Sequence, residues 1–556
     1  MIIGGSIRAL QPAARAAKKI AIQEFDLRNE KGWANRTQPL PCAGFELEMK
    51  NSVWRDARAS FKLLDSGLRP SIRLQSIQTP KPIIPRSLFR LPTRSCWVIM
   101  PGMKYYIWTS GCQMNVADSQ RVSSALEKLG YQSTAQTEEA DVIVLNTCVV
   151  RQSAENKAYG RLTSLRPLKE KRPEITINLM GCLVGVKGNP QLAKTFPFVD
   201  VFSPPSDPDP LVDHLLTLDG SKLETTNVAR RNAIVDEEIV LPNSDQGQLV
   251  SANVPIVLGC SHACTFCIIP FRRGIERSRS VDAIAAQVRS LSDQGVREVT
   301  LLGQIVDRYG TDFEDGANLV DLLRVIHDID GIRRIRFLTS HPLWMTDELI
   351  DAVAELPKVC EHFEVPVQSG DDQVLERMKR GYTVEEYRKL IHRIRERVPG
   401  GMIATDIIVG FPGETKEQFM HTYDLLEELR FDVAHLARYS PRPHTVSKRH
   451  MPDDVSENEK MDRFRALEEL QSKVAAELNM EYNGKVVEVL VEGMNHNRWK
   501  GRTRTNKLVF FESSENMLGE LVPVEIHWTG PWSMRGHLPQ TELPIPATPE
   551  PIHSTK

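Results

Sequence analysis

The stretch "GCSHACTFCIIP", residues 259–270, places Cys260, Cys264 and Cys267 in one short loop. A structural zinc site is normally closed by four protein ligands, so three cysteines suit zinc only if His262 or a distant group completes the set. A cubane iron–sulfur cluster held by three thiolates leaves one iron without a protein ligand. Because that iron can chelate a small molecule and pass an electron to it, we favour an iron–sulfur centre.

Three further cysteines each follow an apolar run directly. "KYYIWTSGC", "ADVIVLNTC" and "EITINLMGC" end at Cys112, Cys148 and Cys182, and helix-like segments separate them. This alternation predicts a parallel α/β sheet, in which the residues past the strand carboxyl ends face a common crevice. We therefore expect the three thiols to converge. The alternative is three unrelated buried cysteines, since free cysteine is commonly buried.

A second α/β series follows and predicts six parallel strands. Its apolar segments are "VPIVLGC", "REVTLLGQ", "RIRFLTSHP", "HFEVPVQSG", "GMIATDIIVGFPGE" and "VAHLARYS". Amphipathic stretches such as "SVDAIAAQVRSLSDQG" lie between them and predict helices. Six repeats indicate a partial barrel, open on one side, with its site at the carboxyl ends of the strands. The loop of Cys260, Cys264 and Cys267 follows the first of these strands.

Length and composition limit the remaining possibilities. A chain of 556 residues exceeds one ordinary domain, so we expect three or four folding units. No run of about 18 apolar residues occurs, which predicts no transmembrane helix. Nine cysteines in so long a chain are too sparse for a disulfide scaffold. The formal net charge of −2 neither favours nor excludes nucleic acid, which depends on local basic patches.

The two ends of the chain differ from its middle. The first hundred residues hold 17 Lys/Arg against 7 Asp/Glu and include the Pro-rich "IQTPKPIIPRSLFRLP", so we expect no packed core there. The acid-free stretch up to Glu24 allows an organellar transit peptide, and a disordered extension or a start at Met103 are the alternatives. The end, "PIPATPEPIHSTK", is a Pro-rich tail.

A C-x-x-x-C-x-x-C motif after the first strand of a partial barrel resembles that of the radical S-adenosylmethionine enzymes. With "TSGCQMNVADSQ", "LNTCVVRQSAENK" and "NLMGCLVG" ahead of it, the sequence resembles the methylthiotransferases from about Lys104 to His537. Within them, "FLTSHP", "HFEVPVQSGDDQVLERMKRGYTVEEY" and "TDIIVGFPGETKEQF" are most similar to the tRNA 2-methylthio-N(6)-isopentenyladenosine synthases.

The resemblance implies an α/β chain of three domains with flanking segments. We expect a basic extension (1–102), a parallel α/β methylthiotransferase domain (103–220), a linker (221–245), a partial (β/α)6 radical S-adenosylmethionine barrel (246–478), a small all-β TRAM barrel (479–541) and a tail (542–556).

The resemblance also implies two [4Fe–4S] clusters. Cys260, Cys264 and Cys267 would hold the cluster that binds S-adenosylmethionine, and Cys112, Cys148 and Cys182 an auxiliary cluster that takes part in sulfur delivery. One S-adenosylmethionine would donate a methyl group and a second would yield the radical that activates C2 of the adenine. The expected product is the 2-methylthio form of isopentenyladenosine at position 37, next to the tRNA anticodon. The cofactor does the difficult chemistry, and the protein positions and shields it.

Three other functions remain open. A methylthiotransferase can instead modify threonylcarbamoyladenosine in tRNA or an aspartate of a ribosomal protein. From a different class, the chain could be an iron–sulfur RNA-binding protein without turnover, which would not cleave S-adenosylmethionine.

Polar residues that end the barrel strands are candidates for S-adenosylmethionine contacts: Gln304, Ser340, Gln368, Gly410, Gly413 and Glu414. One departure from the family pattern lies here, because "GQIVDRYG" has Ile305 and Asp307 where the synthases usually carry asparagines. Tyr439, Arg442 and His444 are expected near the substrate mouth. Cys42, Cys96 and Cys360 have no partners at metal spacing.

The C-terminal segment reads as short alternating strands and resembles a TRAM domain, an RNA-binding barrel. Its "NRWKGRTRTNK" supplies cations for phosphates and one aromatic ring for stacking on an unpaired base. These candidates are Arg498, Trp499, Lys500, Arg502, Arg504 and Lys507. A solvated charged hairpin is the alternative. The expected partners are a tRNA anticodon stem-loop and a one-electron reductant such as flavodoxin or ferredoxin, for a cytoplasmic monomer that does not bind membranes.

Overall fold

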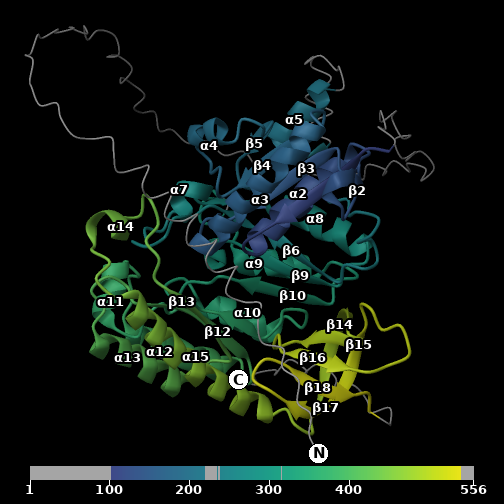
Figure 1. Cartoon of the computed structure of the whole chain (residues 1–556). Coiled ribbons are helices and arrows are strands. Elements are labelled where there is room, and N and C mark those ends of the chain that lie inside the picture. Colours follow the sequence, from purple (N-terminus) through teal and green to yellow (C-terminus); the bar gives the residue numbers. More distant parts are fainter. Residues whose placement is uncertain (1–101, 219–233, 236–237, 315, 540–556) are drawn as a thin grey trace, which may run out of the picture. The chain divides into compact units, whose positions relative to one another are not determined.

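The computed structural model describes residues 102–218, 234–235, 238–314 and 316–539 (Figure 1). All described residues belong to one compact unit. The basic extension up to residue 101, residues 221–233 of the linker and the tail lie outside the described residues, as do Cys42 and Cys96.

The N-terminal domain is a five-stranded parallel sheet in the order β2-β1-β3-β4-β5. Its strands are β1 (Lys104–Thr109), β2 (Gln132–Ser133), β3 (Val142–Thr147), β4 (Thr176–Gly181) and β5 (Val201–Ser203). Its helices are α2 (Gln113–Lys128), the 3₁₀ turn η1 (Thr137–Glu139), α3 (Gln152–Lys171), α4 (Pro190–Thr195) and α5 (Asp209–Leu218). The predicted parallel α/β domain is confirmed.

Side chains alternate between the two faces of this sheet, and helices cover both. Ile143 and Leu145 of β3 face one way and pack with Leu162 of α3, whereas Val142 and Val144 face the other way and pack with α2 and α5. A strand buried on both faces reads as a continuous apolar run, which is what the sequence of β3 shows.

The middle domain contains the six predicted parallel strands as two three-stranded sheets, β10-β9-β6 and β11-β12-β13. These strands are β6 (Ser251–Pro255), β9 (Glu298–Leu302), β10 (Arg334–Leu338), β11 (His362–Glu364), β12 (Met402–Val409) and β13 (Val433–Arg438). A parallel bridge between Ile335 and Val359 joins the two sheets. Within the described ranges β6 and β13 do not pair, so the barrel is open, as predicted.

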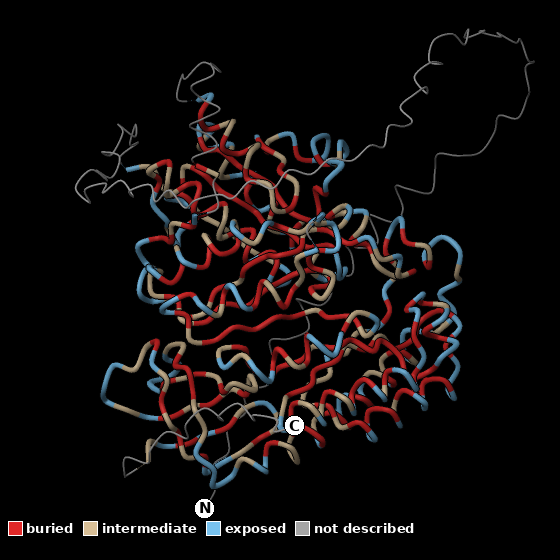
Figure 2. The backbone as a smooth tube through the Cα atoms, turned by 180° about the vertical axis from the view of Figure 1, so that it is seen from behind, coloured by how far each residue is buried: buried red, intermediate tan, exposed pale blue. Residues whose placement is uncertain are grey.

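Helices alternate with these strands and continue past them. They are α7 (Ile269–Arg273), α8 (Val281–Asp293), the 3₁₀ turn η2 (Val306–Arg308), α9 (Leu319–His327), α10 (Asp347–Glu355), α11 (Asp372–Met378), α12 (Val384–Arg397), α13 (Lys416–Leu429), α14 (Val446–His450) and α15 (Glu457–Met480). Several begin at strong local signals, such as the capping boxes of Thr383 with Glu386 and Thr415 with Gln418. Buried residues follow the strands, and exposed residues lie in loops and on outward helix faces (Figure 2).

The predicted extent of the first barrel strand is wrong. β6 begins at Ser251 and ends at Pro255, and the apolar run continues as β7 (Val257–Leu258), which pairs antiparallel with β8 (Arg277–Ser278). Proline cannot donate a ladder hydrogen bond, so the strand ends there and the chain turns out of the sheet. The three-cysteine loop is therefore carried on a short hairpin above the barrel.

The C-terminal domain is a closed barrel in the order β14-β15-β16-β18-β17. Its strands are β14 (Val486–Asn495), β15 (Arg498–Thr503), β16 (Leu508–Phe511), β17 (Leu521–Thr529) and β18 (Met534–His537). The predicted small all-β barrel is confirmed. Across the described part of the chain, no helix combines the length and apolarity needed to cross a lipid bilayer.

Candidate active site

The first cysteine cluster lies at one edge of the N-terminal sheet. Cys148 and Cys182 directly follow β3 and β4, and Cys112 lies three residues beyond β1. These three strands are neighbours in the sheet. The topology therefore places the three cysteines at one edge of the sheet, after neighbouring strands.

Buried amides tie the ends of these strands together. The Cys112 Sγ lies 3.4 Å from the Asn115 Oδ1, and the Asn115 Nδ2 donates to the Asn146 Oδ1 and to the Thr147 carbonyl, both at 2.9 Å. The same Thr147 carbonyl accepts from the Cys182 backbone N–H at 2.9 Å. The approach is close enough to require glycine at Gly111, where φ is +133° and a Cβ would lie 2.5 Å from the Cys148 Cβ.

Burial dominates the electrostatics of these thiols. It raises the pKa of Cys148, and it raises the pKa of Cys182 to about 11. Among the charged groups that act on Cys182, Arg273 lowers its pKa most, and Asp118 raises it by less. The thiols of Cys148 and Cys182 are neutral at physiological pH, so a metal that binds them as thiolates must release their protons.

The second cluster, Cys260, Cys264 and Cys267, lies in the loop between β7 and β8. The loop is closed by a hydrogen bond from the Cys260 N–H to the Gly274 carbonyl (3.0 Å) and another from the Cys267 N–H to the Cys264 carbonyl (3.2 Å). Gly259 has φ +74°, and a Cβ there would lie 2.1 Å from the Ile275 carbonyl oxygen. The hairpin thus fixes where the three thiols lie.

A buried arginine supports this loop from the barrel. The Arg380 Nη1 lies 3.3 Å from the Cys264 Sγ, and its Nη2 donates to the Pro366 carbonyl at 3.1 Å. Burial raises the pKa of Cys260 to about 11 and of Cys267 to about 12, and repulsion from Cys264 adds to both shifts.

The donor sets suit cubane clusters better than single ions. Among the described residues, no group of three or more Cys, His, Asp or Glu side chains lies close enough to hold one metal ion. The His262 ring packs edge-on against His341 and Trp344, with centroids 4.8 and 5.2 Å apart, so it does not complete a zinc site. In a cubane each thiolate binds a different iron, which needs a wider spacing. Both trios consist of soft thiols, which fit that group; Cys148, Cys182 and Cys260 are buried, Cys264 and Cys267 are half-buried, and Cys112 is exposed.

The N-terminal domain packs onto the barrel next to the first cysteine cluster. Met114 and Ala117, just after Cys112, pack against Leu302 and Leu338, the last residues of β9 and β10. The helix that begins at the first cluster therefore lies over the carboxyl ends of the barrel strands, where the second cluster is.

A cavity of about 630 Å³ runs down the inside of the barrel. All three domains line it: Gln113 and Arg151 from the N-terminal domain, Glu364 and Asp406 from the barrel, and Lys507 from the C-terminal barrel, among others. Burial, with the nearby charge of Asp406, raises the pKa of Glu364 to about 7.

The strand-end residues predicted to contact S-adenosylmethionine lie at the top of the barrel. Gln304, Ser340 and Gln368 follow β9, β10 and β11. The Ser340 Oγ is buried and has no hydrogen-bond partner within the described residues, and so is available to a ligand. Thr339 and Gln368 have positive φ angles of 69° and 73°, which are unusual for residues other than glycine and cluster at functional sites.

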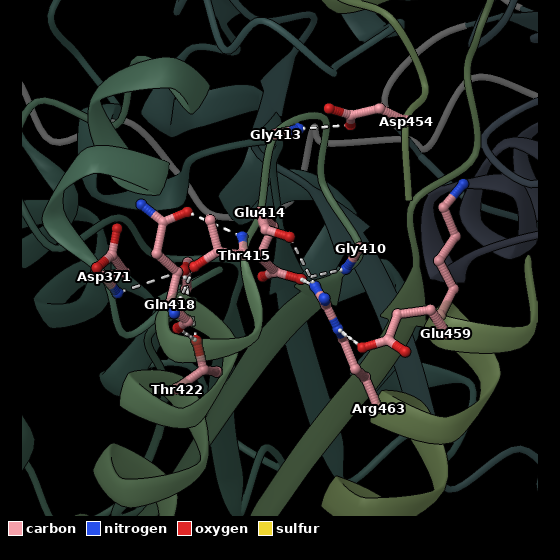
Figure 3. Close-up of polar contacts among 12 residues, drawn as sticks. Asp371, Gly410, Gly413, Glu414, Thr415, Gln418, Thr422, Asp454, Glu459 and Arg463 are labelled. Atoms are coloured by element: carbon pink, nitrogen blue, oxygen red, sulfur yellow. Dashed lines mark hydrogen bonds and ion pairs between the residues drawn. The ribbon is translucent and has the colours of Figure 1, made fainter. Parts of the chain in front are cut away.

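Glu414 instead holds its own loop. Its Oε2 accepts hydrogen bonds from the Gly410 N–H and the Arg463 Nη1, both at 2.6 Å (Figure 3). The Gly413 N–H donates to Asp454 at 2.7 Å. These contacts fix the turn after β12 and give Glu414 a structural role in this state.

The two residues that depart from the family pattern are both buried. Ile305 packs against Cys260, Ile269 and Trp344 at the cluster loop. The Asp307 carboxylate accepts the His341 N–H at 2.9 Å, and burial raises its pKa to about 7. The pKa of His341 is lowered to about 2, chiefly by burial, so its ring is neutral.

Asp307→Asn is expected to stabilise the protein more at pH 8.5 than at pH 6. A folded pKa above the unfolded value means that the wild type loses stability as pH rises from the unfolded pKa, near 4, to about 7. The amide removes this loss, which amounts to at most about 4 kcal/mol. Thermal unfolding at both pH values measures it, with exposed Asp330→Asn as control. An equal gain at both pH values contradicts the assignment.

The residues predicted to bind RNA in the C-terminal barrel are mostly engaged within the chain. Arg504 pairs with Glu361 (2.8 Å) and donates to the Pro357 and Val359 carbonyls, and Lys507 pairs with Asp432 (2.6 Å). These contacts dock the β15–β16 loop onto the amino ends of the barrel strands, opposite the cysteines.

The remaining members of that set differ in exposure. Trp499 is buried in the core of the small barrel. Arg502 lines the cavity and pairs with Glu492. Arg498 is exposed beside Glu512, and Lys500 is half-buried.

Three buried arginines near the site were not identified from the sequence, which placed Arg442 only near the substrate mouth. Arg273, Arg336 and Arg380 are buried, and their partners lie far away in sequence. Arg442 joins the barrel to the first turn of α3 through Gln152 and Glu155. The partners of these residues lie far away in sequence, so no local pattern identifies the contacts that bury them.

Comparison with known proteins agrees with this architecture. Family models match residues 254–426 (Radical SAM superfamily), 104–203 (Uncharacterized protein family UPF0004) and 481–538 (TRAM domain). A tRNA-2-methylthio-N(6)-dimethylallyladenosine synthase of Herpetosiphon aurantiacus is 45% identical over 452 residues, covering 81% of this chain and all of that protein.

One further sequence relative and one solved structure also match this chain. A protein of the same name from a Roseiflexus species is 46% identical and covers 79% of this chain and 90% of that protein. Among solved structures, the radical S-adenosylmethionine methyltransferase TsrM of Kitasatospora setae, with cobalamin and a [4Fe–4S] cluster bound, aligns at a TM-score of 0.46 and 15% identity, over 63% of this chain and 74% of that chain. On the sequence relatives, the chain belongs to the family of tRNA-2-methylthio-N(6)-dimethylallyladenosine synthases.

Proposed function

We propose that this enzyme adds a methylthio group to C2 of N(6)-isopentenyladenosine at position 37 of tRNA. The observation that carries this proposal is the pair of cysteine trios, one at the edge of the N-terminal sheet and one on the β7–β8 hairpin, in two domains that pack against each other through Met114 and Ala117. The relatives that cover the chain from its N-terminal sheet to its C-terminal barrel carry the name of this activity.

The cofactors are S-adenosylmethionine and [4Fe–4S] clusters. We assign one cluster to Cys112, Cys148 and Cys182, and one to Cys260, Cys264 and Cys267. When bound, these groups supply one-electron chemistry together with the methyl group and sulfur. The chain's own residues hold and shield them: the thiols bind iron, Ser340 offers a free hydroxyl, and Glu364 and Asp406 offer acceptor oxygens to amino groups in the cavity. The enclosing walls keep water from a reactive radical.

The tRNA loop is proposed to approach an apolar strip beside both clusters. The strip consists of Val186, Phe271, Ile275 and His444; the first three are at least 39% exposed. Its parts lie close together, because the Phe271 and His444 rings are 6.2 Å apart and the Val186 N–H donates to the Arg272 carbonyl at 3.0 Å.

The charge around this strip suits a phosphate backbone. Exposed Arg151, Lys187, Lys448 and Arg449 lie on the elements that flank it. Two acids near the strip, Glu155 and Glu276, are paired with Arg442 and Arg308. Cations beside an exposed aromatic ring are the usual means of binding single-stranded RNA.

Phe271→Ala is expected to weaken binding of the anticodon stem-loop about 5- to 100-fold, the effect of losing about 1–3 kcal/mol of base stacking. Fluorescence anisotropy with a labelled stem-loop measures it. Met420→Ala, at a similarly exposed position on the outer face of α13, is the control. Equal binding by both variants and the parent would place the RNA elsewhere.

Mass spectrometry of the product decides among the candidate substrates. The reconstituted enzyme, with reductant and S-adenosylmethionine, is incubated with tRNA carrying isopentenyladenosine, with tRNA carrying threonylcarbamoyladenosine, or with ribosomal proteins. We expect a 2-methylthio nucleoside from the first only. Product from either of the others reassigns the substrate, and no cleavage of S-adenosylmethionine would favour an RNA-binding protein without turnover.

The remaining assignments follow from this chemistry. We propose a monomer that works in the cytoplasm, a reducing compartment, with flavodoxin or ferredoxin as electron donor. All seven described cysteines are free thiols, which agrees with such a compartment.

A further inference from the structure

Arg273 crosses from the barrel into the cysteine cluster of the other domain. It ends α7, six residues after Cys267, and its side chain is almost completely buried. Its Nη2 donates to the Asp118 Oδ2 at 2.9 Å and to the Asn115 Oδ1 at 3.2 Å, and its Nη1 donates to the Ser206 Oγ at 3.1 Å. An arginine of the barrel domain thus donates hydrogen bonds to three side chains of the N-terminal domain.

Through Asn115, this guanidinium is connected to the ends of all three cysteine-bearing strands. The Asn115 Oδ1 that accepts from Arg273 also lies 3.4 Å from the Cys112 Sγ. The Nδ2 of the same amide donates to the Thr147 carbonyl, which adjoins Cys148 and also accepts the Cys182 N–H. Moving Arg273 would therefore disturb the three ligand positions together.

Stability alone does not explain a buried ion pair here. An apolar pair of the same shape often stabilises a protein as well or better, because burying charges costs desolvation. A cluster ligated by three thiolates is anionic, and an added anionic sulfur ligand increases that charge. A cation buried beside the cluster offsets this cost, since nearby opposite charge favours the charged form in a low-dielectric site.

We propose that Arg273 is a positioning residue of the auxiliary cluster, which orients the Cys112 loop through Asn115 and stabilises an anionic sulfur ligand on the iron that lacks a thiolate. This inference rests on the proposed cluster at Cys112, Cys148 and Cys182. Since Arg273 belongs to the barrel domain, both domains would take part in retaining the sulfur ligand on the auxiliary cluster.

The test uses the Cys260→Ala/Cys264→Ala/Cys267→Ala protein, in which only the auxiliary cluster is loaded. Arg273→Gln leaves Asp118 buried and unpaired, so Arg273→Gln/Asp118→Asn is made beside it to keep the packing without charge. The dissociation constant for added hydrosulfide and the midpoint potential of the cluster are measured by electron paramagnetic resonance. Arg277→Gln, exposed on β8, is the matched control.

We expect the double variant to bind hydrosulfide about 10- to 100-fold more weakly than the parent, the usual effect of losing a group that orients metal ligands. Its midpoint potential should become more negative, because Arg273 acts on Cys182 more strongly than Asp118 does, so that losing both charges destabilises the reduced, more anionic cluster. Arg273→Lys should restore the potential toward the parent value, and Arg277→Gln should change neither quantity.

Two results would overturn the inference. If the double variant matches the parent in both quantities, Arg273 serves packing only, and the proposed function stands. If the parent of this series binds no iron, the auxiliary cluster assignment fails and the inference fails with it. Neither measurement requires tRNA or turnover, so a wrong substrate assignment does not affect the result.

Discussion

Replacing Cys112, Cys148 and Cys182 together by alanine is expected to separate cleavage of S-adenosylmethionine from methylthio transfer. This variant should still release 5′-deoxyadenosine, because the loop of Cys260, Cys264 and Cys267 is carried on its own hairpin and supported by Arg380 from the barrel. It should form no methylthio nucleoside. The variant with Cys260, Cys264 and Cys267 replaced should give neither product.

Liquid chromatography with mass spectrometry measures both products in the same reaction. Cys360→Ala is the control, because that thiol is buried and lies just before β11, at the opposite end of the barrel strands from the cysteine clusters. Both products should persist in this variant. Methylthio product from the first triple variant would show that the N-terminal thiols do not take part in sulfur transfer.

Arg336→Met is expected to lower the free energy of unfolding by about 3–5 kcal/mol, because it leaves a buried carboxylate without its partner. Arg336 and Glu298 are 3% and 4% exposed, and their Nε and Oε2 atoms lie 3.1 Å apart. Arg336 also donates to the Thr503 and Arg504 carbonyls at 2.8 and 2.6 Å, so the docked loop of the C-terminal barrel loses two bonds as well. Thermal unfolding followed by circular dichroism measures the loss.

Two further variants show whether the loss of stability comes from burying an unpaired charge. Arg333→Met breaks an exposed pair with Glu520 and should cost less than about 1 kcal/mol. Arg336→Met/Glu298→Gln removes both buried charges and should recover part of the loss. If Arg336→Met were as stable as Arg333→Met, neither the buried pair with Glu298 nor the bonds from Arg336 to the C-terminal domain would contribute to stability.

This docking gives the C-terminal barrel a role besides RNA contact. Asn506 and Lys507 line the cavity inside the barrel. The β15–β16 loop therefore closes part of that cavity. Of the predicted RNA-binding set, Trp499 and Lys507 are buried, Arg498 is exposed, and Lys500, Arg502 and Arg504 are half-buried.

The parts of this architecture that follow from local sequence were predictable. A run such as "DVIVLNTC" predicts both a buried strand and the residue at which it ends. Parallel topology then places Cys148 at the same edge of the sheet as Cys112 and Cys182. The barrel strands and the closed C-terminal barrel were accessible for the same reason, because alternation and turn residues are local.

Features that depend on distant partners were not predictable. "RTRTNK" reads as a basic hairpin for RNA, yet Arg504 and Lys507 are neutralised by Glu361 and Asp432, which belong to another domain. Arg273 likewise appears as one of several cations in "FRRGIERSR" until the fold brings it to Asp118. The break after Pro255 was missed because the apolar run continues through it.

The central claim is that two separate cubane clusters serve one reaction chamber, and counting iron and sulfide tests it most directly. The protein is purified and reconstituted without oxygen, beside the Cys260→Ala/Cys264→Ala/Cys267→Ala variant. The account predicts about eight irons per chain in the parent and about four in the variant, because each cubane holds four. About four irons in the parent, unchanged in the variant, would mean that the barrel loop holds no cluster and would contradict the radical mechanism.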